Sequence, residues 1–308
     1  MNRRETLIIG ASGFVGWYLM TALRQDRPVT GTYTHHRLPG LISLDMTDTE
    51  NMRRVFDQVQ PELVLCPARH SYVEGVERDP EGTRKFNIHP FSPLLELVRS
   101  AGSCLVFFST EYVFDGTAGP YSEDAPTNPI NEYGRQKLAV ERMIQSALEN
   151  YLIIRLSAPY GWEYQNKNFV VNLLRDLRAE KPVAVPCDQI VTPTYIVNFV
   201  CAVKALVVTG CTGVYHVAGS EPMVRTEFAK LVAEVFDLDS TLVRPVLTSE
   251  LNLLAPRPVS AGLKTERAQA RLGFRLTPPK EGLKAMRATE AEYAACFSEL
   301  QRKSCESD

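Results

Sequence analysis

Short apolar runs alternate with amphipathic stretches through the first half of the chain. Brief runs rich in branched and aromatic residues predict buried strands, and apolar positions three or four apart in the longer stretches predict helices. The predicted strands are 6–9, 29–33, 63–66, 105–109 and 152–155, and the predicted helices are 13–23, 49–59, 79–100 and 131–148. Pro80 and Pro90 should disturb the third helix, because proline has no backbone N–H to donate. The alternation predicts an α/β fold with a parallel sheet covered on both faces.

The alternation loosens after residue 161. Helices are predicted at 168–179, 195–208, 225–236 and 265–272, strands at 183–186 and 215–218, and a proline-rich turn at 255–259. The tail 293–308 is polar, and its last residues are expected to fray. We expect residues 1–160, completed by 194–218, to form the sheet domain, and 161–193 with 219–308 to form a smaller C-terminal lobe.

The composition is that of an ordinary globular chain, with 308 residues of which 44% are hydrophobic and 23% charged. A net charge of -2 provides no basic field for nucleic acid or for an anionic membrane. The start of the chain is neither a signal peptide nor long enough to span a bilayer, so we expect a cytoplasmic protein. Seven cysteines without a Cys-x-x-Cys spacing predict neither a disulfide framework nor a metal site.

Three glycines spaced Gly-x-x-Gly-x-x-Gly follow the first predicted strand directly and open onto a helix. Glycine permits a tight turn and a close approach of the backbone, and the N-terminus of a helix presents unpaired N–H groups to a pyrophosphate. A glycine-bearing turn is common between a strand and a helix, but its position after the first strand favours a dinucleotide and a Rossmann-type doubly wound sheet. The expected contacts are Gly10, Ser12, Gly13, Phe14, Val15 and Gly16.

The end of the second predicted strand should select the cofactor. Residues 31–37 contain no carboxylate for the ribose of NAD(H), whereas Arg37 and the hydroxyls of Thr32 and Thr34 suit the extra phosphate of NADP(H). We therefore expect NADP(H) over NAD(H), although Arg37 is equally a candidate for a solvated loop charge. Asp45 is placed to meet the adenine amino group or to begin a helix, for which Asp48 is better placed. The cofactor contacts predicted outside the glycine loop are Thr32, His35, Arg37, Asp45, Met46 and Ala68.

Tyr133 and Lys137 lie four residues apart in a predicted helix, so both side chains should occupy one face. A free tyrosine titrates near ~10, and a neighbouring cation favours the phenolate, which makes the phenol a better acid near neutrality. The alternative is a surface helix in which Lys137 pairs with Glu141. Thr110 ends the fourth predicted strand at the carboxyl edge of the sheet, where it can reach a substrate oxygen beside Tyr133.

Together, these motifs resemble the extended short-chain dehydrogenase/reductases, and within them the dTDP-4-dehydrorhamnose reductase group. The matching segments are 10–16, 45–48, 86–87, 109–116, 129–138 with Glu141, 168–169, 188–189, 193–194, 257–258 and 272–274. They follow one another over nearly the whole chain, which is more specific than any single motif.

The resemblance implies that Thr110, Tyr133 and Lys137 are the catalytic residues. A nicotinamide then delivers hydride to the C4 keto group of a nucleotide-linked 4-keto-6-deoxy sugar. Tyr133 protonates the oxygen, Thr110 orients it, and Lys137 holds the ribose and activates the phenol. The smaller lobe is implied to bind the nucleotide-sugar substrate, as in dTDP-rhamnose and polysaccharide biosynthesis, and a homodimer stays open. The implied substrate contacts are Glu111, Tyr112, Asn168, Phe169 and Arg257. Read without the resemblance, Asn168 is a helix N-terminal residue, Phe169 a core aromatic residue and Arg257 a loop charge.

The chain departs from the family at the edge of the expected site. Glu111 stands where an aspartate is usual, and Cys66 to His70 replaces a common Asn-Ala-Ala, so that Arg69 and His70 should change the wall near the nicotinamide. His70 is also a candidate second acid, although a lone loop histidine is more often a satisfied polar group. Two further readings stay open: a nucleotide-sugar epimerase or dehydratase, and a non-catalytic NADP-binding regulatory subunit resembling the methionine adenosyltransferase β subunit.

Overall fold

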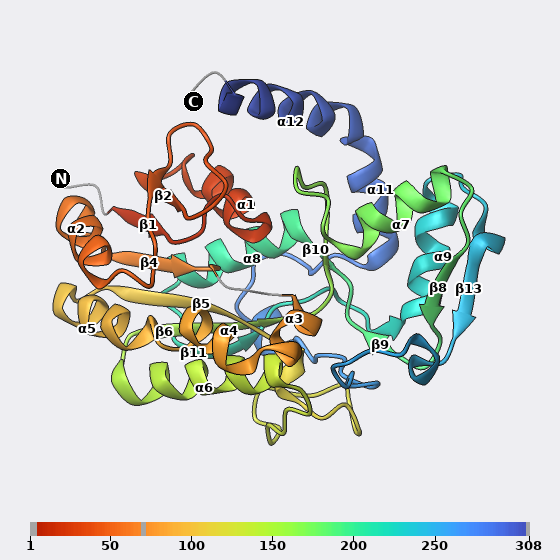
Figure 1. The fold of residues 1–308 in the computed structure, drawn as a ribbon, viewed down its shortest axis with the longest axis horizontal. Helices are drawn as coiled ribbons and strands as arrows, with labels where there is room; N and C mark the ends of the chain where they lie inside the picture. Colours follow the sequence, from red (N-terminus) through yellow and green to blue (C-terminus); the bar gives the residue numbers. More distant parts are fainter. Residues whose placement is uncertain (1–4, 69–71, 306–308) are drawn as a thin grey trace.

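The computed structural model describes residues 5–68 and 72–305. Its centre is a seven-stranded parallel sheet in the order β11-β6-β5-β4-β1-β2-β3 (Figure 1). The strands are β1 (Thr6–Ile8), β2 (Val29–Tyr33), β3 (Ile42–Ser43), β4 (Leu63–Cys66), β5 (Cys104–Thr110), β6 (Tyr151–Leu156) and β11 (Gly213–His216). The strand order reverses between β1 and β4, and ligands of open α/β sheets bind at the carboxyl ends of strands beside such a reversal. The predicted Rossmann-type fold is confirmed.

Helices cover both faces of the sheet (Figure 1). The helices that pack on it are α1 (Phe14–Leu23) and α8 (Ile196–Val208) on one face, and α2 (Thr49–Val59), α5 (Phe91–Ala101) and α6 (Glu132–Ala147) on the other. Successive side chains of a strand point to opposite faces. Phe108 accordingly packs with α1 and α8, whereas Phe107 packs with α5 and α6. The apolar runs are therefore continuous because each strand is buried on both sides.

The second half of the chain adds a smaller lobe beside the sheet. Its elements are β7 (Pro159–Tyr160), α7 (Phe169–Arg178), β8 (Val183–Pro186), β9 (Ile190–Val191), β10 (Thr194–Tyr195), β12 (Met223–Val224), α9 (Arg225–Val235), η2 (Ser240–Leu242), β13 (Val243–Val246), η3 (Thr248–Leu251) and α11 (Pro279–Ala288). The short helix α10 (Glu266–Gln269) packs beside β11 of the central sheet instead. Three two-stranded pairings, β8 with β13, β9 with β12 and β7 with β10, hold these segments together. The lobe has its own core, formed mainly by α7, α9 and α11. The predicted domain boundaries stay a prediction.

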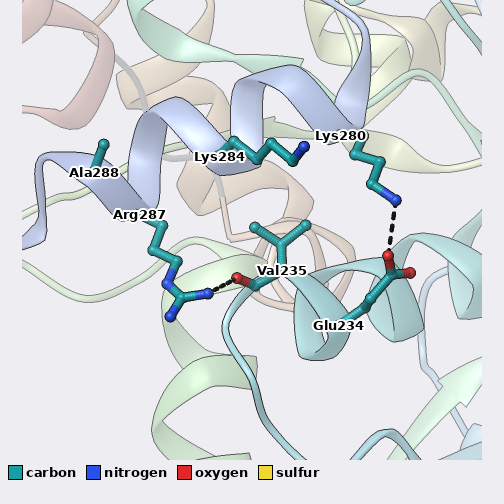
Figure 2. A pocket seen from close by; sticks show the side chains of 6 residues that line it. All are labelled: Glu234, Val235, Lys280, Lys284, Arg287 and Ala288. Atoms are coloured by element: carbon teal, nitrogen blue, oxygen red, sulfur yellow. Dashed lines mark hydrogen bonds and ion pairs between the residues drawn. The ribbon is translucent and has the colours of Figure 1, made fainter.

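An open hollow of about 530 Å³ lies between α9 and α11 in this lobe. Figure 2 shows Lys280 directed at Glu234, with 2.8 Å between the charged atoms, and Arg287 donating to the carbonyl oxygen of Val235 at 2.6 Å. These contacts join the two helices across the hollow. None of the residues that line it belongs to the predicted site.

Several boundaries differ from the sequence-based expectation. The predicted helix 79–100 is two helices, α4 (Pro80–Asn87) and α5, because Pro90 stands at the N-cap of the second. The strand predicted at 215–218 begins and ends two residues earlier, in register with β6. The helix predicted at 265–272 is limited to α10. The helices α3 (Val73–Arg78) and α11 were not predicted, since α3 has a single buried residue and α11 begins at a proline.

The polar tail, for which no helix was predicted, contains α12 (Glu290–Cys305), which returns over α1 (Figure 1), and the fraying expected of the last residues stays a prediction. Tyr293 and Phe297 lie one helical turn apart and therefore share a face. Their ring centroids lie 5.9 and 5.7 Å from that of Trp17. Two aromatic residues among polar ones are thus enough to dock the helix. Within residues 5–68 and 72–305, no helix has the length and apolar character needed to cross a membrane.

Candidate active site

The glycine loop between β1 and α1 requires its glycines. A Cβ on Gly16 would lie 2.2 Å from the carbonyl oxygen of Gly10, and Gly10 itself has a φ of 91°, a region that side chains disfavour. A Cβ on Gly10 would also meet the Ala68 side chain at 2.8 Å. Gly13 is the N-cap of α1, and no side chain of the described chain caps it there. The turn therefore offers backbone N–H groups to a pyrophosphate, and it fits a dinucleotide.

A segment that follows β7 lies against this loop. Tyr164 Oη and Gln165 Nε2 both donate to the carbonyl oxygen of Ser12, at 3.1 and 3.0 Å. The Tyr164 ring also meets His36, with 6.4 Å between the ring centroids. Burial lowers the pKa of His36, and the charge of Lys167 adds to the effect. Sequence reasoning missed Tyr164 and Gln165, because no motif surrounds them.

The residues after β2 divide between structural and exposed positions. Thr32 is buried, and its hydroxyl accepts a hydrogen bond from the N–H of Gly10 at 3.1 Å. Thr34 donates to the carbonyl oxygen of Leu44 at 2.9 Å. Thr32 thus shapes the glycine loop and Thr34 ties β2 to the next strand, and the contact of their hydroxyls with a cofactor phosphate stays a prediction. His35 and Arg37 are exposed at the end of β2.

Asp45 and Asp48 have different roles, as the sequence suggested. Asp48 caps α2 by accepting a hydrogen bond from the N–H of Asn51 at 3.0 Å. Asp45 is exposed and accepts bonds from the N–H and hydroxyl of Thr47, both at 2.8 Å. Met46, between them, is buried. The cap predicted for Asp48 is confirmed, and the adenine contact of Asp45 stays a prediction.

The helix that carries Tyr133 and Lys137 is fixed at its first turn. Asn131 caps α6 by accepting a bond from the N–H of Gly134 at 2.8 Å, and its amide donates to the carbonyl oxygen of Pro256 at 2.8 Å. A Cβ on Gly134 would lie 2.1 Å from the carbonyl oxygen of Tyr112. Glycine at this position therefore lets η1 (Glu111–Val113), which follows β5, pack directly on α6.

Tyr133 and Lys137 are both buried, with 6% and 5% of their surface exposed. The Lys137 ammonium donates to the carbonyl oxygen of Phe108 at 2.5 Å and lies 4.3 Å from the centre of the Phe107 ring. Glu141 instead forms a buried ion pair with Arg155, with 2.6 Å between the charged atoms. The reading of Lys137 as part of a solvated surface pair is therefore wrong.

Thr110 and Glu111 form a buried polar group at the carboxyl end of β5. The Thr110 hydroxyl donates to one carboxylate oxygen of Glu111 at 2.8 Å, and the Ser157 hydroxyl donates to the other at 3.2 Å. Burial raises the pKa of Glu111, while these hydrogen bonds and the charge of Arg225 oppose the shift. Ser157, which follows β6, was not predicted from the sequence. The carboxyl group thus holds the Thr110 hydroxyl in one orientation.

Tyr112 connects this group to Tyr133 and Arg257. The Tyr112 and Tyr133 rings are nearly perpendicular with centroids 5.9 Å apart, and the Arg257 guanidinium carbon lies 6.0 Å from the centre of the Tyr112 ring. Burial, followed by the charge of Glu111, raises the pKa of Tyr112. Arg257 is ion-paired with Glu74, with 2.5 Å between the charged atoms. The positive charge of Arg257, which was expected to meet a diphosphate, is thus already paired with the negative charge of Glu74.

Asn168 and Phe169 lie at the start of α7. The Asn168 side chain caps α7 through the N–H of Val171 at 3.3 Å and donates to the carbonyl oxygen of Gly161 at 2.9 Å. Phe169 is half-buried beneath Arg225, whose guanidinium carbon lies 4.4 Å from the centre of its ring. Sequence reasoning did not single out Arg225. Arg69 and His70, which were expected to change the wall of the site, lie outside the described residues.

Known proteins resemble this chain over most of its length. The family model described as RmlD substrate binding domain matches residues 4–291. A "probable low-salt glycan biosynthesis reductase" of Haloferax volcanii is 30% identical over 94% of this chain and 99% of the relative, and methionine adenosyltransferase 2 subunit beta of Danio rerio is 28% identical over 91% and 89%.

Two solved structures extend the comparison. A dTDP-4-dehydrorhamnose reductase from Bacillus anthracis in complex with NADP has a TM-score of 0.85 and 25% identity, and the match covers 93% of this chain and 99% of that chain. A hypothetical dTDP-4-dehydrorhamnose reductase from Sulfolobus tokodaii has a TM-score of 0.81 and 30% identity, covering 89% and 96%.

Proposed function

The chain belongs to the RmlD substrate binding domain family of extended short-chain dehydrogenase/reductases, and from that premise we propose that it reduces the C4 keto group of a nucleotide-linked 4-keto-6-deoxy sugar with NADPH. It is an oxidoreductase of the nicotinamide-dependent kind. The observation that carries the proposal is the burial of Tyr133 and Lys137 on α6, which packs against β5 and η1 where Thr110 ends the strand.

A bound nicotinamide would supply the hydride. Tyr133 would donate its phenolic proton to the oxygen that becomes the alcohol, and Thr110 would hold that oxygen by a hydrogen bond. The buried ammonium of Lys137 would stabilise negative charge on the phenol and bind a ribose hydroxyl. The single hydroxyl proton of Thr110, which is donated to Glu111 in this structure, would turn from that carboxyl group to the substrate oxygen. The protein's share of the catalysis is therefore alignment and a proton donor.

The preference for NADPH rests on the chain after β2. Residues 31–37 offer no carboxylate to a ribose hydroxyl, while the exposed Arg37 offers a positive charge. The relative from Bacillus anthracis was solved with NADP. Titration of both reduced cofactors should give tighter binding of NADPH, and tighter binding of NADH would contradict the preference.

A second candidate is a cofactor-binding regulatory subunit. It is favoured by the likeness to methionine adenosyltransferase 2 subunit beta of several vertebrates, at 27% to 29% identity. The two functions differ in turnover. Stoichiometric oxidation of NADPH with a 4-keto-6-deoxy sugar nucleotide supports the reductase, whereas tight NADPH binding without turnover across dTDP-, UDP- and GDP-linked sugars supports the regulatory subunit.

Replacement of Tyr133 by phenylalanine tests the mechanism. Tyr133→Phe removes only the proton donor, so we expect turnover to fall by about 10² to 10⁴-fold while NADPH affinity changes little. Tyr151→Phe is the matched control, because Tyr151 begins β6, at the other end of the strand from Ser157, and the change is predicted to leave the rate unchanged. Initial rates of NADPH oxidation and a fluorescence titration of NADPH supply both readouts. A near-normal rate in Tyr133→Phe refutes the assignment.

A further inference from the structure

Arg225 brings a positive charge from the smaller lobe to the edge of the catalytic group. It is the first residue of α9, and its guanidinium interacts electrostatically with Glu111, Tyr112 and Arg257. Glu111 and Tyr112 directly follow Thr110, the last residue of β5, and the Arg257 guanidinium carbon lies 6.0 Å from the centre of the Tyr112 ring. Arg225 is therefore a lobe residue whose charge acts on the two residues that follow Thr110.

In the part of the chain that the structure describes, no carboxylate forms an ion pair with Arg225, although the charge of Glu111 acts on it. Its guanidinium forms no hydrogen bond or ion pair there, and its contact is the face of the Phe169 ring at 4.4 Å. Burial is the main cause that lowers the pKa of Arg225, while Tyr112 and Glu111 oppose it, and a guanidinium stays protonated at neutral pH. The Glu111 carboxylate that acts on it is held by the hydroxyls of Thr110 and Ser157.

The other arginines around the site are neutralised by the fold. Arg257 is paired with Glu74 and donates to the carbonyl oxygen of Ala255 at 3.1 Å, and Arg155 is paired with Glu141. A half-buried cation without such a partner loses water contacts, and no protein group offsets the free-energy cost of that loss. An anion bound beside Phe169 would offset it.

We propose that Arg225, seated on the Phe169 ring, binds an anionic oxygen group of the substrate. The group is either a phosphate of the nucleotide diphosphate or a carboxylate on the sugar, since a guanidinium fork matches both. The aromatic face limits the rotamers of the arginine and so reduces the entropy lost on binding. The inference rests on the proposed function, because it places this anion beside Thr110 and Tyr133. In this proposal Arg225 provides the positive charge for the substrate, because the charge of Arg257 is paired with Glu74.

Affinity measurements on the full chain with saturating NADPH test the proposal. The probes are dTDP, UDP, UDP-glucose and UDP-glucuronate, titrated by calorimetry against wild type, Arg225→Met and Arg225→Gln. Loss of a charged hydrogen-bond partner should weaken binding by about tenfold to a hundredfold. If the anion is a phosphate, all four probes weaken; if it is a sugar carboxylate, UDP-glucuronate alone weakens.

Two further variants separate charge from structure. Arg225→Lys keeps the charge but loses the fork, so its affinity should lie between those of wild type and Arg225→Met. Arg244→Met removes an exposed arginine from β13 of the same lobe and should bind like wild type. NADPH affinity must stay unchanged in each variant, which shows that the fold is intact.

Unchanged binding of every probe by both neutral variants overturns the role of Arg225 and leaves the proposed reductase standing. If the NADPH-bound wild type binds none of these probes and oxidises NADPH with no dTDP-, UDP- or GDP-linked 4-keto-6-deoxy sugar, the proposed function is overturned and the inference falls with it. The Tyr133→Phe assay measures turnover rather than binding, so it identifies which of the two proposals has failed.

Discussion

A single methyl group on Gly134 tests whether the contact between α6 and η1 sets the geometry of the site. The Cβ of Gly134→Ala would lie 2.1 Å from the carbonyl oxygen of Tyr112, and real Cβ contacts do not fall below 3.0 Å, so that oxygen must recede by about 0.9 Å. The start of α6 is held by the Asn131 cap, whereas η1 is a short segment that directly follows Thr110. The displacement should therefore fall on Thr110 and Glu111.

The expected magnitude follows from that displacement. A misplacement of about 1 Å among reacting groups costs on the order of 100-fold in rate, and overpacking costs about 1–3 kcal/mol in stability. Helix propensity alone gives the opposite sign for stability, because alanine is favoured over glycine by roughly 1 kcal/mol in a helix interior. The two effects are therefore distinguishable in one variant.

The assay combines kcat/KM for NADPH oxidation with a urea titration and an NADPH binding curve. Gly134→Ala should lose most of its activity and retain NADPH affinity, since the glycine loop belongs to a different turn. Gly273→Ala is the matched control, because a Cβ on Gly273 meets nothing within 4 Å. Wild-type activity in Gly134→Ala would show that η1 does not determine the position of Thr110.

Two stability predictions concern the network behind the site. Burial, followed by the charge of Arg155, lowers the pKa of His216 to about 3, so the unfolded chain takes up a proton below pH ~6.5 that the folded chain refuses. The part of the folding stability that depends on His216 should therefore fall by about 2 kcal/mol from pH 7 to pH 5. Urea unfolding of wild type against His216→Gln measures this part as a difference, and exposed His89→Gln is the control that should leave the pH dependence unchanged. Glu141→Gln leaves the buried Arg155 without its anion and should lower the free energy of unfolding by about 3–5 kcal/mol. Glu50→Gln, in an exposed pair, should lower it by less than about 1 kcal/mol, and equal losses in the two variants would refute the distinction.

The sheet was predictable because a parallel strand buried on both faces leaves a short, continuous apolar run in the sequence. The five strands predicted in the first half all lie in the central sheet. The smaller lobe was less predictable, since its pairings join segments far apart in the chain and its strands have only two to four residues. The docking of α12 depends on the contact between Tyr293 and Trp17. The local pattern of apolar positions cannot predict a contact between segments so far apart in the chain.

The side chains proposed for catalysis were easier to place from the sequence than those proposed for binding. Tyr133 and Lys137 are placed by one helix, and their spacing alone states that they share a face. Ser157 belongs to the same polar group as Thr110, but it reaches Glu111 only because β6 lies beside β5 in the sheet. The spacing of Ser157 and Glu111 along the chain does not show that the two side chains are neighbours.

The choice between Arg225 and Arg257 shows why charge on a loop is a poor guide to binding. Arg257 belongs to a family-like motif, yet its partner Glu74 lies 183 residues earlier in the sequence and compensates its charge. Arg225 belongs to no such motif, and the antiparallel pairing of β12 with β9 precedes the start of α9, where the guanidinium lies over the Phe169 ring and its charge acts on Glu111. Whether an arginine is available to a ligand depends on the acids that the fold brings to it, so the cation to test at this site is Arg225, with which no carboxylate of the described residues forms an ion pair.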